Sequence, residues 1–485
     1  MRATTRPLPM AADLYGDIEP TPRARLPDYL PGLVIVVLGT LAAGFLSDRY
    51  GAPLTLMALL IGLSLNFLSA DSRLTPGLAF ASRSLLRWGI VLVGVRITFG
   101  QILALLKPTL ETEFAWSDQD YANMGTAFQF ATAVAFLGTG WFIDRVGLRY
   151  GFALGVAVWS LAGMAHAFAT SVAGFIAARV VLGVGESVGT PAAVKTAATY
   201  FERHDRQMAL GIGNTAPNVG AIVTPLFIPA LAVAFGWQAA FLVAGGLGLV
   251  WVAVWFALRI APVASDAVAP AAVPWLSVLR SRETLTIAIA KVLSDQVWFF
   301  MLLWLPDLFH RLFGMKQGTL GLPVALVYVF AAFGALTGGY IPQRLMANGW
   351  SVNRARKTAM LVYALLILPI PLVMYLESPW SAALLLGLGL FAHQGFSTNV
   401  FALTTDIVPA RNVGSTIGIA AFCGNMGSIG MIQFSAWSLG HGLGYAPMLA
   451  ICACSYLVAL GMIQLLLGRI VPIESDGSDA VVMAH

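Results

Sequence analysis

Residues 179–200 have the sequence RVVLGVGESVGTPAAVKTAATY, in which three charged side chains interrupt a run of apolar and small residues. The run predicts one long apolar helix, in which an ion at hydrocarbon depth costs about 2.5–3.5 kcal/mol on insertion scales. Arg179 and Glu186 are two helical turns apart and therefore project from one face, whereas Lys195 projects from another side near the helix end. The charged pair predicts a helix that lines a water-filled cavity or meets an ionic partner, and does not face lipid there.

The composition of the whole chain is that of a multi-pass membrane protein. Of its 485 residues, 58% are hydrophobic and 11% are charged, whereas soluble domains carry about 25% charged residues. Apolar runs of about 20 residues, the length that crosses ~30 Å of hydrocarbon, recur from end to end. Because backbone groups in lipid must bond internally, we expect an all-helical fold of about 14 spans.

The apolar runs and polar stretches divide the chain into six parts. We expect a polar tail at 1–30, extra membrane helices at 31–87, a first group of core helices at 88–258, a linker at 259–283, a second group at 284–468 and a tail at 469–485. The first tail lacks the apolar centre and cleavage site of a signal peptide and is therefore expected to stay in the cytoplasm. Residues 107–120 are polar and acidic and predict a loop.

Arginine and lysine residues concentrate in alternate loops. They are Arg145, Arg149, Arg203, Arg206, Arg259, Arg280, Arg282, Arg344, Arg354, Arg356, Lys357 and Arg411. Loops rich in these residues stay in the cytoplasm, so both termini are predicted to be cytoplasmic, in an inner (plasma) membrane, with the acidic loop outside. The net charge of +5 is interpreted as this orientation signal, and nucleic-acid binding is not expected.

The sequence favours neither a metal or cofactor site nor an intramembrane enzyme. Cys423, Cys452 and Cys454 lie in apolar spans and have neither metal-ligand nor disulfide spacing. An enzyme within the membrane would need a nucleophile–base pair or a metal cluster, and the spans show no grouping of histidine, aspartate and cysteine that supplies one.

A charged turn between two spans carries the first family resemblance. The sequence GWFIDRVGLR begins at Gly140 and ends at Arg149, and it resembles the G-x-x-x-D-R-x-G-x-R signature of the major facilitator superfamily through Gly140, Asp144, Arg145, Gly147 and Arg149. An aspartate near a helix end beside arginines makes charge-assisted bonds that latch neighbouring helices in one state of a transport cycle. The resemblance implies that these residues form a gating loop; the alternative is an ordinary charged turn.

Residues 179–200 carry a second and narrower resemblance. The spacing of Arg179, Gly183, Glu186 and Pro191 is similar to that in the fourth helix of the anion:cation symporter family within that superfamily. Further stretches resemble hexuronate transporters, at residues 291–306, 349–358, 392–399 and 406–415. Over about residues 106–470 the resemblance implies two pseudo-symmetric helical halves and a secondary transporter that couples a sugar-acid anion, such as glucuronate or galacturonate, to protons.

The N-terminal part departs from that family. Residues 28–105 resemble the start of a family named for sulfate export, so the first helix of the facilitator half is replaced, although Pro108 and the two residues after it still match. Counting back from Pro108, the first-helix arginine of the symporters would fall at Gly100, and Arg96 lies one turn away on the same face. We expect residues 88–108 to occupy the first-helix position, with Arg96 facing the central cavity.

The charged pair is the main candidate for binding and coupling. Arginine is permanently charged and holds a carboxylate through two hydrogen bonds, so Arg179 suits the carboxylate of a sugar acid. A structural ion pair with Glu186 is the alternative. For Glu186, burial favours the protonated form and Arg179 favours the ionised form, so protonation and substrate occupancy compete. Glu186 is therefore the expected proton carrier.

Other polar and aromatic side chains in the spans are candidates with a structural alternative. Five amide side chains suit hydrogen bonds to sugar hydroxyls, and the alternative for each is a hydrogen bond between helices. They are Gln129, Asn214, Asn218, Asn399 and Asn425. Trp298 and Phe299 suit stacking on the sugar or plain packing, and His393 is a second proton site or a satisfied core histidine. Lys195 is a candidate for the site, and the alternative is that it extends its amine to the interface. Lys291 and Asp295 are expected to form a structural i,i+4 pair.

These features predict a proton-coupled symporter of a hexuronate or related sugar acid, a monomer whose halves rock about a site near the midplane. Its expected partners are the organic anion, protons and the lipid bilayer, and no cofactor. Two alternatives stay open. In the first, the chimeric N-terminus leaves a membrane protein without transport activity; in the second, the substrate is another small anion such as sulfate.

Overall fold

The computed structural model describes residues 26–50, a few positions between 61 and 78, and residues 99–200, 206–257 and 278–470. The chain forms two compact units, residues 1–93 and 94–485, and each is described by itself. In the first unit, α1 (Leu26–Tyr50) is an apolar helix with Pro31 near its start. Our predictions for Arg96, most of the linker and most of the terminal tails lie outside the described residues.

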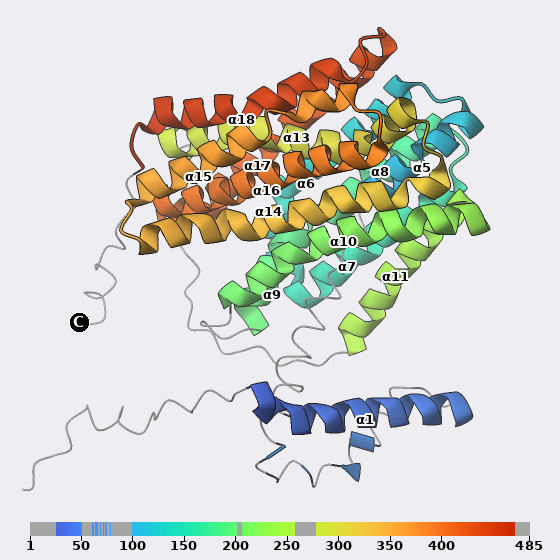
Figure 1. The fold of residues 1–485 in the computed structure, drawn as a ribbon. Helices are drawn as coiled ribbons and strands as arrows, with labels where there is room; N and C mark the ends of the chain where they lie inside the picture. Colours follow the sequence, from blue (N-terminus) through green and yellow to red (C-terminus); the bar gives the residue numbers. More distant parts are fainter. Residues whose placement is uncertain are drawn as a thin grey trace, which may run out of the picture. The chain divides into compact units, whose positions relative to one another are not determined.

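The second unit is built from two successive groups of helices (Figure 1). The first, called the N-half, contains α5 (Phe99–Phe114), α6 (Asp118–Val146), α7 (Leu148–Ala165), α8 (Val172–Ser187), α9 (Gly189–Tyr200), α10 (Arg206–Phe235) and α11 (Trp237–Ala257). The second, called the C-half, contains α13 (Arg282–Phe313), α14 (Gly321–Ala347), α15 (Val352–Leu366), α16 (Pro379–Ile407), α17 (Ala410–Gly440) and α18 (Ala446–Leu467). Short 3₁₀ segments follow α7, α13 and α15, at His166–Phe168, Gln317–Thr319 and Ile370–Tyr375.

The predicted all-helical membrane fold is confirmed. In the part of the chain that the structure describes, 10 helices are long and apolar enough to cross a membrane. We expected about 14 spans, and several of those fall wholly or partly outside the described residues. The 16-residue α5 and the longer α16 are not among the 10, yet they complete the N-half and the C-half.

Local sequence signals set where the helices begin and end. Ser117 and Asp120 form a capping box that starts α6, because each side chain accepts a hydrogen bond from the backbone N–H of the other. Gly147, with φ of 87°, ends the same helix, and Gly314, with φ of 63°, ends α13. Positive φ is accessible to glycine without strain, so both positions turn the chain sharply.

The single helix predicted over residues 179–200 is interrupted. The structure has α8 up to Ser187 and α9 from Gly189, with Val188 between them. The N–H of Val188 bonds back to Gly185 at 3.4 Å, an i→i−3 contact. Pro191 has no N–H to donate to the carbonyl of Ser187, four residues earlier, and its ring crowds that carbonyl. The proline therefore breaks the helix one turn before its own position.

The loop predicted over residues 107–120 is also corrected, because α5 continues to Phe114. Lys107 is 1% exposed and pairs with Glu111, one turn further along the same helix, at 3.1 Å. The first part of this polar stretch is therefore helical and contains a buried lysine with an ion-pair partner, and residues 115–117 connect α5 to α6.

The N-half packs against the C-half mainly through α5 with α13, α6 with α17, and α10 with α14. In Figure 1 α10 and α14 run side by side. We call the end of the second unit at which α5 ends and α6 begins the acidic end, after Glu111, Asp118 and their neighbours. The opposite end, at which α6 ends and α7 begins beside Arg145, is called the basic end.

Candidate functional site

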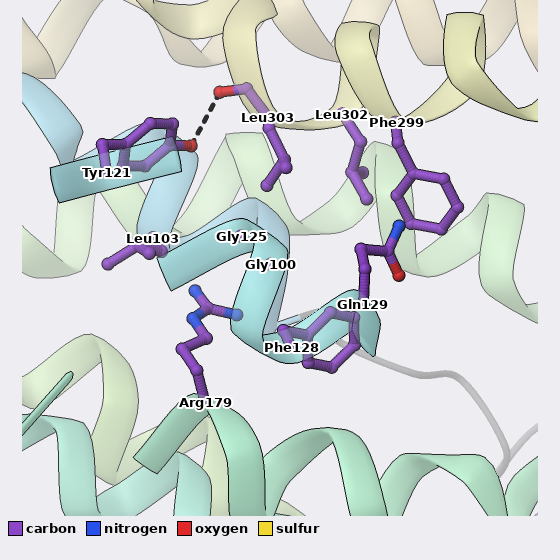
Figure 2. A pocket seen from close by; sticks show the side chains of 10 residues that line it. All are labelled: Gly100, Leu103, Tyr121, Gly125, Phe128, Gln129, Arg179, Phe299, Leu302 and Leu303. Atoms are coloured by element: carbon purple, nitrogen blue, oxygen red, sulfur yellow. Dashed lines mark hydrogen bonds between the residues drawn. The ribbon is translucent and has the colours of Figure 1, made fainter. Parts of the chain in front are cut away.

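A small cavity lies where the two halves meet. It is lined by residues of α5, α6 and α8 in the N-half and of α13 in the C-half (Figure 2). The lining residues are Gly100, Leu103, Tyr121, Gly125, Phe128, Gln129, Arg179, Phe299, Leu302 and Leu303. Most of this lining is apolar, and a few polar groups converge in it, as is typical of sites for small molecules.

Arg179 is the charged residue of this lining. Its side chain is 1% exposed and extends from α8 toward α5 and α6 (Figure 2). One terminal nitrogen donates a hydrogen bond of 3.0 Å to the backbone carbonyl of Phe99, and the guanidinium lies 5.9 Å from the centre of the Phe128 ring. The Nε atom is buried and has no hydrogen-bond partner, so the guanidinium retains donor capacity for a ligand.

Gln129 supplies the second unsatisfied polar group of the cavity. Its side chain is 1% exposed, and neither its amide oxygen nor its amide nitrogen has a partner among the described residues. Figure 2 shows this amide beside Phe299 of α13. Leaving a buried donor or acceptor without a partner costs about 1–3 kcal/mol. A polar ligand that meets both Gln129 and Arg179 would remove this cost.

Close packing of α8 on α6 brings these two residues to the same cavity. A Cβ atom at Gly183 would lie 2.6 Å from the backbone carbonyl oxygen of Phe128, so only glycine fits at this crossing. Thr132 strengthens the contact, because its hydroxyl donates to the carbonyls of Phe128 at 2.8 Å and of Gly183 at 3.3 Å. Small residues at such crossings are typical of helix packing in membranes.

Glu186 lies in the last turn of α8, seven residues after Arg179, and is partly buried. Its charge acts electrostatically on the guanidinium of Arg179. The two residues that we selected from the sequence as an anion-binding and proton-carrying pair are therefore electrostatically coupled within one helix.

The predicted gating loop lies at the basic end. Asp144 forms an ion pair with Lys195 of α9, so α6 and α9 are joined across the N-half. The Arg145 guanidinium is 5.8 Å from the centre of the Trp141 ring. Arg149 donates to the carbonyl of Phe256 in α11 at 2.9 Å. Gly147 is the turn residue described above, and a Cβ at Gly140 would meet nothing within 4 Å.

The other candidate amides make contacts between or within helices. Asn218 accepts a hydrogen bond from Gln394 of α16 at 3.2 Å, which links the halves. Asn399 donates to the carbonyls of Gly338 and Gly395 and so ties α16 to α14. Asn425 donates to the carbonyl of Ala421 in its own helix at 2.9 Å. The side chain of Asn214 lies outside what the structure describes.

The aromatic candidates separate into two groups. Phe299 lines the cavity, whereas Trp298 stacks on His393 inside the C-half, with ring centres 5.5 Å apart. The Nδ1 atom of His393 lies 2.7 Å from the hydroxyl of Tyr456. Lys291 and Asp295 form the predicted i,i+4 ion pair at 2.7 Å, and that prediction is confirmed.

The sequence patterns did not predict the cluster of charged residues at the acidic end. We define this acidic-end cluster as Lys107, Glu111, Asp118, Asp307 and Arg311, which lie within salt-bridge distance of one another. Asp307 directly follows an apolar stretch of α13 at residues 297–306, and a carboxylate in such a place is a sequence signal that would have found it.

Comparisons with known proteins fit this architecture. The sequence profile of the Major Facilitator Superfamily matches residues 89–431. The chain belongs to this superfamily. The facilitator is similar to a D-galactonate transporter of Escherichia coli, at 26% identity over 397 residues that cover 75% of this chain and 91% of that protein. It is also similar to a hexuronate transporter of Escherichia coli, at 25% identity over 397 residues that cover 76% and 91%.

A solved structure shows the same fold. It is a bacterial homologue of the human lysosomal transporter Spinster in an inward-facing and occupied conformation, with a TM-score of 0.62, 16% identity, and coverage of 80% of this chain and 96% of that chain.

The N-terminal part of this facilitator has a different relationship. The profile named Conserved hypothetical protein 698 matches residues 30–119, and a UPF0324 membrane protein of Rhizobium meliloti is 54% identical over 77 residues, 16% of this chain and 22% of that protein. The two profiles overlap over residues 89–119. Helix α5 therefore lies inside the overlap, at the junction of the two sequence families.

Proposed function

We propose that this facilitator is a proton-coupled symporter of a sugar-acid anion, with a hexuronate or an aldonate as substrate. The observation that carries the proposal is the cavity between the halves, where the guanidinium of Arg179 and the amide of Gln129 are buried with unused hydrogen-bonding capacity. The similarity to hexuronate and D-galactonate transporters over most of the chain supports the same substrate class.

The lining of the cavity suits the two parts of a sugar acid. Arg179 would hold the carboxylate through its planar fork of donors. Gln129 can both donate to and accept from sugar hydroxyls, since its amide carries two donors and an acceptor. Phe128 and Phe299 would meet the C–H face of the sugar, as aromatic rings do with apolar surfaces.

Glu186 is the proposed proton carrier. It shares a helix face and an electrostatic interaction with Arg179, so an anion bound to Arg179 weakens the attraction that keeps Glu186 ionised. Anion binding therefore favours proton binding at Glu186, and release of one favours release of the other, which is what symport requires. Alternate rocking of the two halves would expose the cavity to either side.

The positive charges at the basic end support a cytoplasmic position for that end and an external position for the acidic end. Arg145, Arg149, Arg354, Arg356 and Lys357 all lie there, and such residues are enriched on the cytoplasmic side of inner-membrane proteins.

Uptake by the purified protein in proteoliposomes tests the proposal. With an inward proton gradient, labelled glucuronate or galacturonate should accumulate, and unlabelled D-galactonate should compete. Sulfate serves as the competitor that represents a small inorganic anion. Accumulation of labelled sulfate by the same vesicles, with no accumulation of labelled sugar acid, would replace the substrate class. No accumulation of any of these anions by a folded protein would favour the alternative of a membrane protein without transport activity.

A further inference from the structure

The strongest feature outside the substrate cavity is the acidic-end cluster that pairs α5 with the C-half. The ammonium of Lys107 bonds to Asp307 at 2.8 Å, to Asp118 at 3.0 Å and to Glu111 at 3.1 Å. The same ammonium lies 5.4 Å from the ring centres of both Tyr121 and Trp304. A lysine that is 1% exposed thus joins α5, α6 and α13 at one point.

Arg311 completes the cluster from the C-half. Its guanidinium bonds to Asp307, one turn earlier in α13, at 2.8 Å and to Asp118 of α6 at 2.6 Å. Asp307 is fully buried and also accepts a hydrogen bond from the hydroxyl of Tyr445. Each cation therefore meets carboxylates of both halves, and separation of the halves at this end breaks the Lys107–Asp307 and Arg311–Asp118 pairs together.

Further polar contacts between the halves lie at the same end. The hydroxyl of Thr109 donates to Gln317 at 3.1 Å, and Gln433 of α17 bonds to Gln119, Asn123 and Thr126 of α6. Among the described side chains, the ion pairs at the basic end instead stay within one half: Asp144 with Lys195, and Arg356 with Asp406. The halves are therefore fastened to each other at the acidic end.

Lys107 is placed to control access to the substrate cavity. Leu103 lies one turn before it in α5 and lines the cavity, as does Gly100. Arg179 also depends on this helix, because it bonds to the carbonyl of Phe99. A shift of α5 would therefore open the cavity to the acidic end and change the position of the substrate-binding arginine together.

We infer that Lys107 is a positioning residue that holds α5 in the place of the replaced first helix, and that the acidic-end cluster is the gate that must open to admit substrate from that side. Lys107 lies within residues 89–119, where the two sequence profiles overlap. The segment at the junction of the two families therefore carries a residue that bonds it to the C-half. The role of the gate in a transport cycle rests on the proposed function, whereas the attachment of α5 does not.

Cysteine accessibility tests the gate without any substrate. The probe is Leu103→Cys in a protein with Cys423, Cys452 and Cys454 replaced by alanine, labelled with a membrane-impermeant maleimide in intact cells. Lys107→Met and Asp307→Asn should each raise the labelling rate about tenfold or more, because removing one partner of a buried ion pair leaves the other charge uncompensated. Lys107→Arg keeps the charge and should restore slow labelling. Lys316→Met, at an exposed lysine of the same end, is the matched control.

The outcomes separate the two proposals. Labelling of folded Lys107→Met and Asp307→Asn that is as slow as in the parent would overturn the gate. If Lys107→Met does not reach the membrane, the comparison of Asp307→Asn with Lys107→Arg decides by the same criterion. If Lys107→Met and Asp307→Asn are labelled fast while the parent protein accumulates no sugar acid, the gate is supported and the proposed substrate is contradicted.

Discussion

Arg179 is held in place by contacts with α5 and α6 and still has a hydrogen-bond donor that no described residue uses. Its guanidinium is buried against the Phe128 ring and bonded to a backbone carbonyl of α5, yet its Nε atom has no partner. The sequence predicted the burial of this charge, because an arginine in an apolar run must face a cavity or a partner. It did not predict the bond to Phe99, since α5 belongs to the part of the chain that departs from the symporter pattern.

The geometry of the guanidinium gives the first prediction. Arg179→Lys keeps a positive charge but loses the planar fork that binds a carboxylate through two bonds. We expect the apparent KM for glucuronate to rise about tenfold or more, with a smaller change in the maximal rate. Arg344→Lys, at an exposed position at the end of α14, is the control. An unchanged KM in Arg179→Lys would exclude a bidentate contact with the substrate.

Gln129 gives a second prediction at the same scale. Gln129→Leu removes two buried polar atoms that have no partner among the described residues, so the empty protein should be at least as stable as the parent. Transport should fall about tenfold, because a hydroxyl of the bound sugar would then face an apolar side chain. A melting curve in detergent and the uptake rate are the two measurements. If Gln129→Leu melts at a higher temperature than the parent and takes up substrate at the normal rate, Gln129 is not part of the binding site.

The sequence predicted where helices lie along the chain better than it predicted where a helix is interrupted. The predicted end of the first group of core helices, at residue 258, and the observed end of α11 (Trp237–Ala257) nearly coincide, because a long apolar run between polar boundaries has few alternatives. The break at Val188 was missed, because Pro191 lies within an apolar run that hydropathy treats as continuous. Lys107 was assigned to a loop because its partner Asp307 is 200 positions away, and no local pattern reports such a contact.

The crossing of α8 and α6 yields a prediction at this scale. Gly183→Ala would place a Cβ atom 2.6 Å from a backbone oxygen, and overpacking of this kind costs about 1–3 kcal/mol. The variant should melt at a lower temperature in detergent and lose transport, since α8 carries Arg179. Gly246→Ala in α11, where a Cβ meets nothing within 4 Å, should be neutral or slightly stabilising. Equal melting temperatures for the two variants would show that the helices do not approach so closely.

For the whole molecule, the separation into two units gives a prediction about the N-terminal segment. Helix α5 belongs to the unit formed by residues 94–485 and packs against α10 and α13 within it. Removal of residues 1–87 takes away the extra membrane helices predicted at 31–87 and leaves α5 with its partners, so we expect transport to survive. Removal of residues 1–114 also deletes α5 and should abolish transport. Loss of transport in both truncations, with normal insertion, would mean that the first unit is required.

The most direct measurement follows proton and sugar-acid fluxes in the same proteoliposomes. In the parent protein, addition of galacturonate outside should acidify the lumen as anion and proton enter together, and a proton gradient should drive uphill accumulation. In Glu186→Gln, the exchange of labelled for unlabelled galacturonate should persist while acidification and uphill accumulation are lost. Uphill accumulation by Glu186→Gln at the parental level would contradict proton coupling through the pair formed by Arg179 and Glu186.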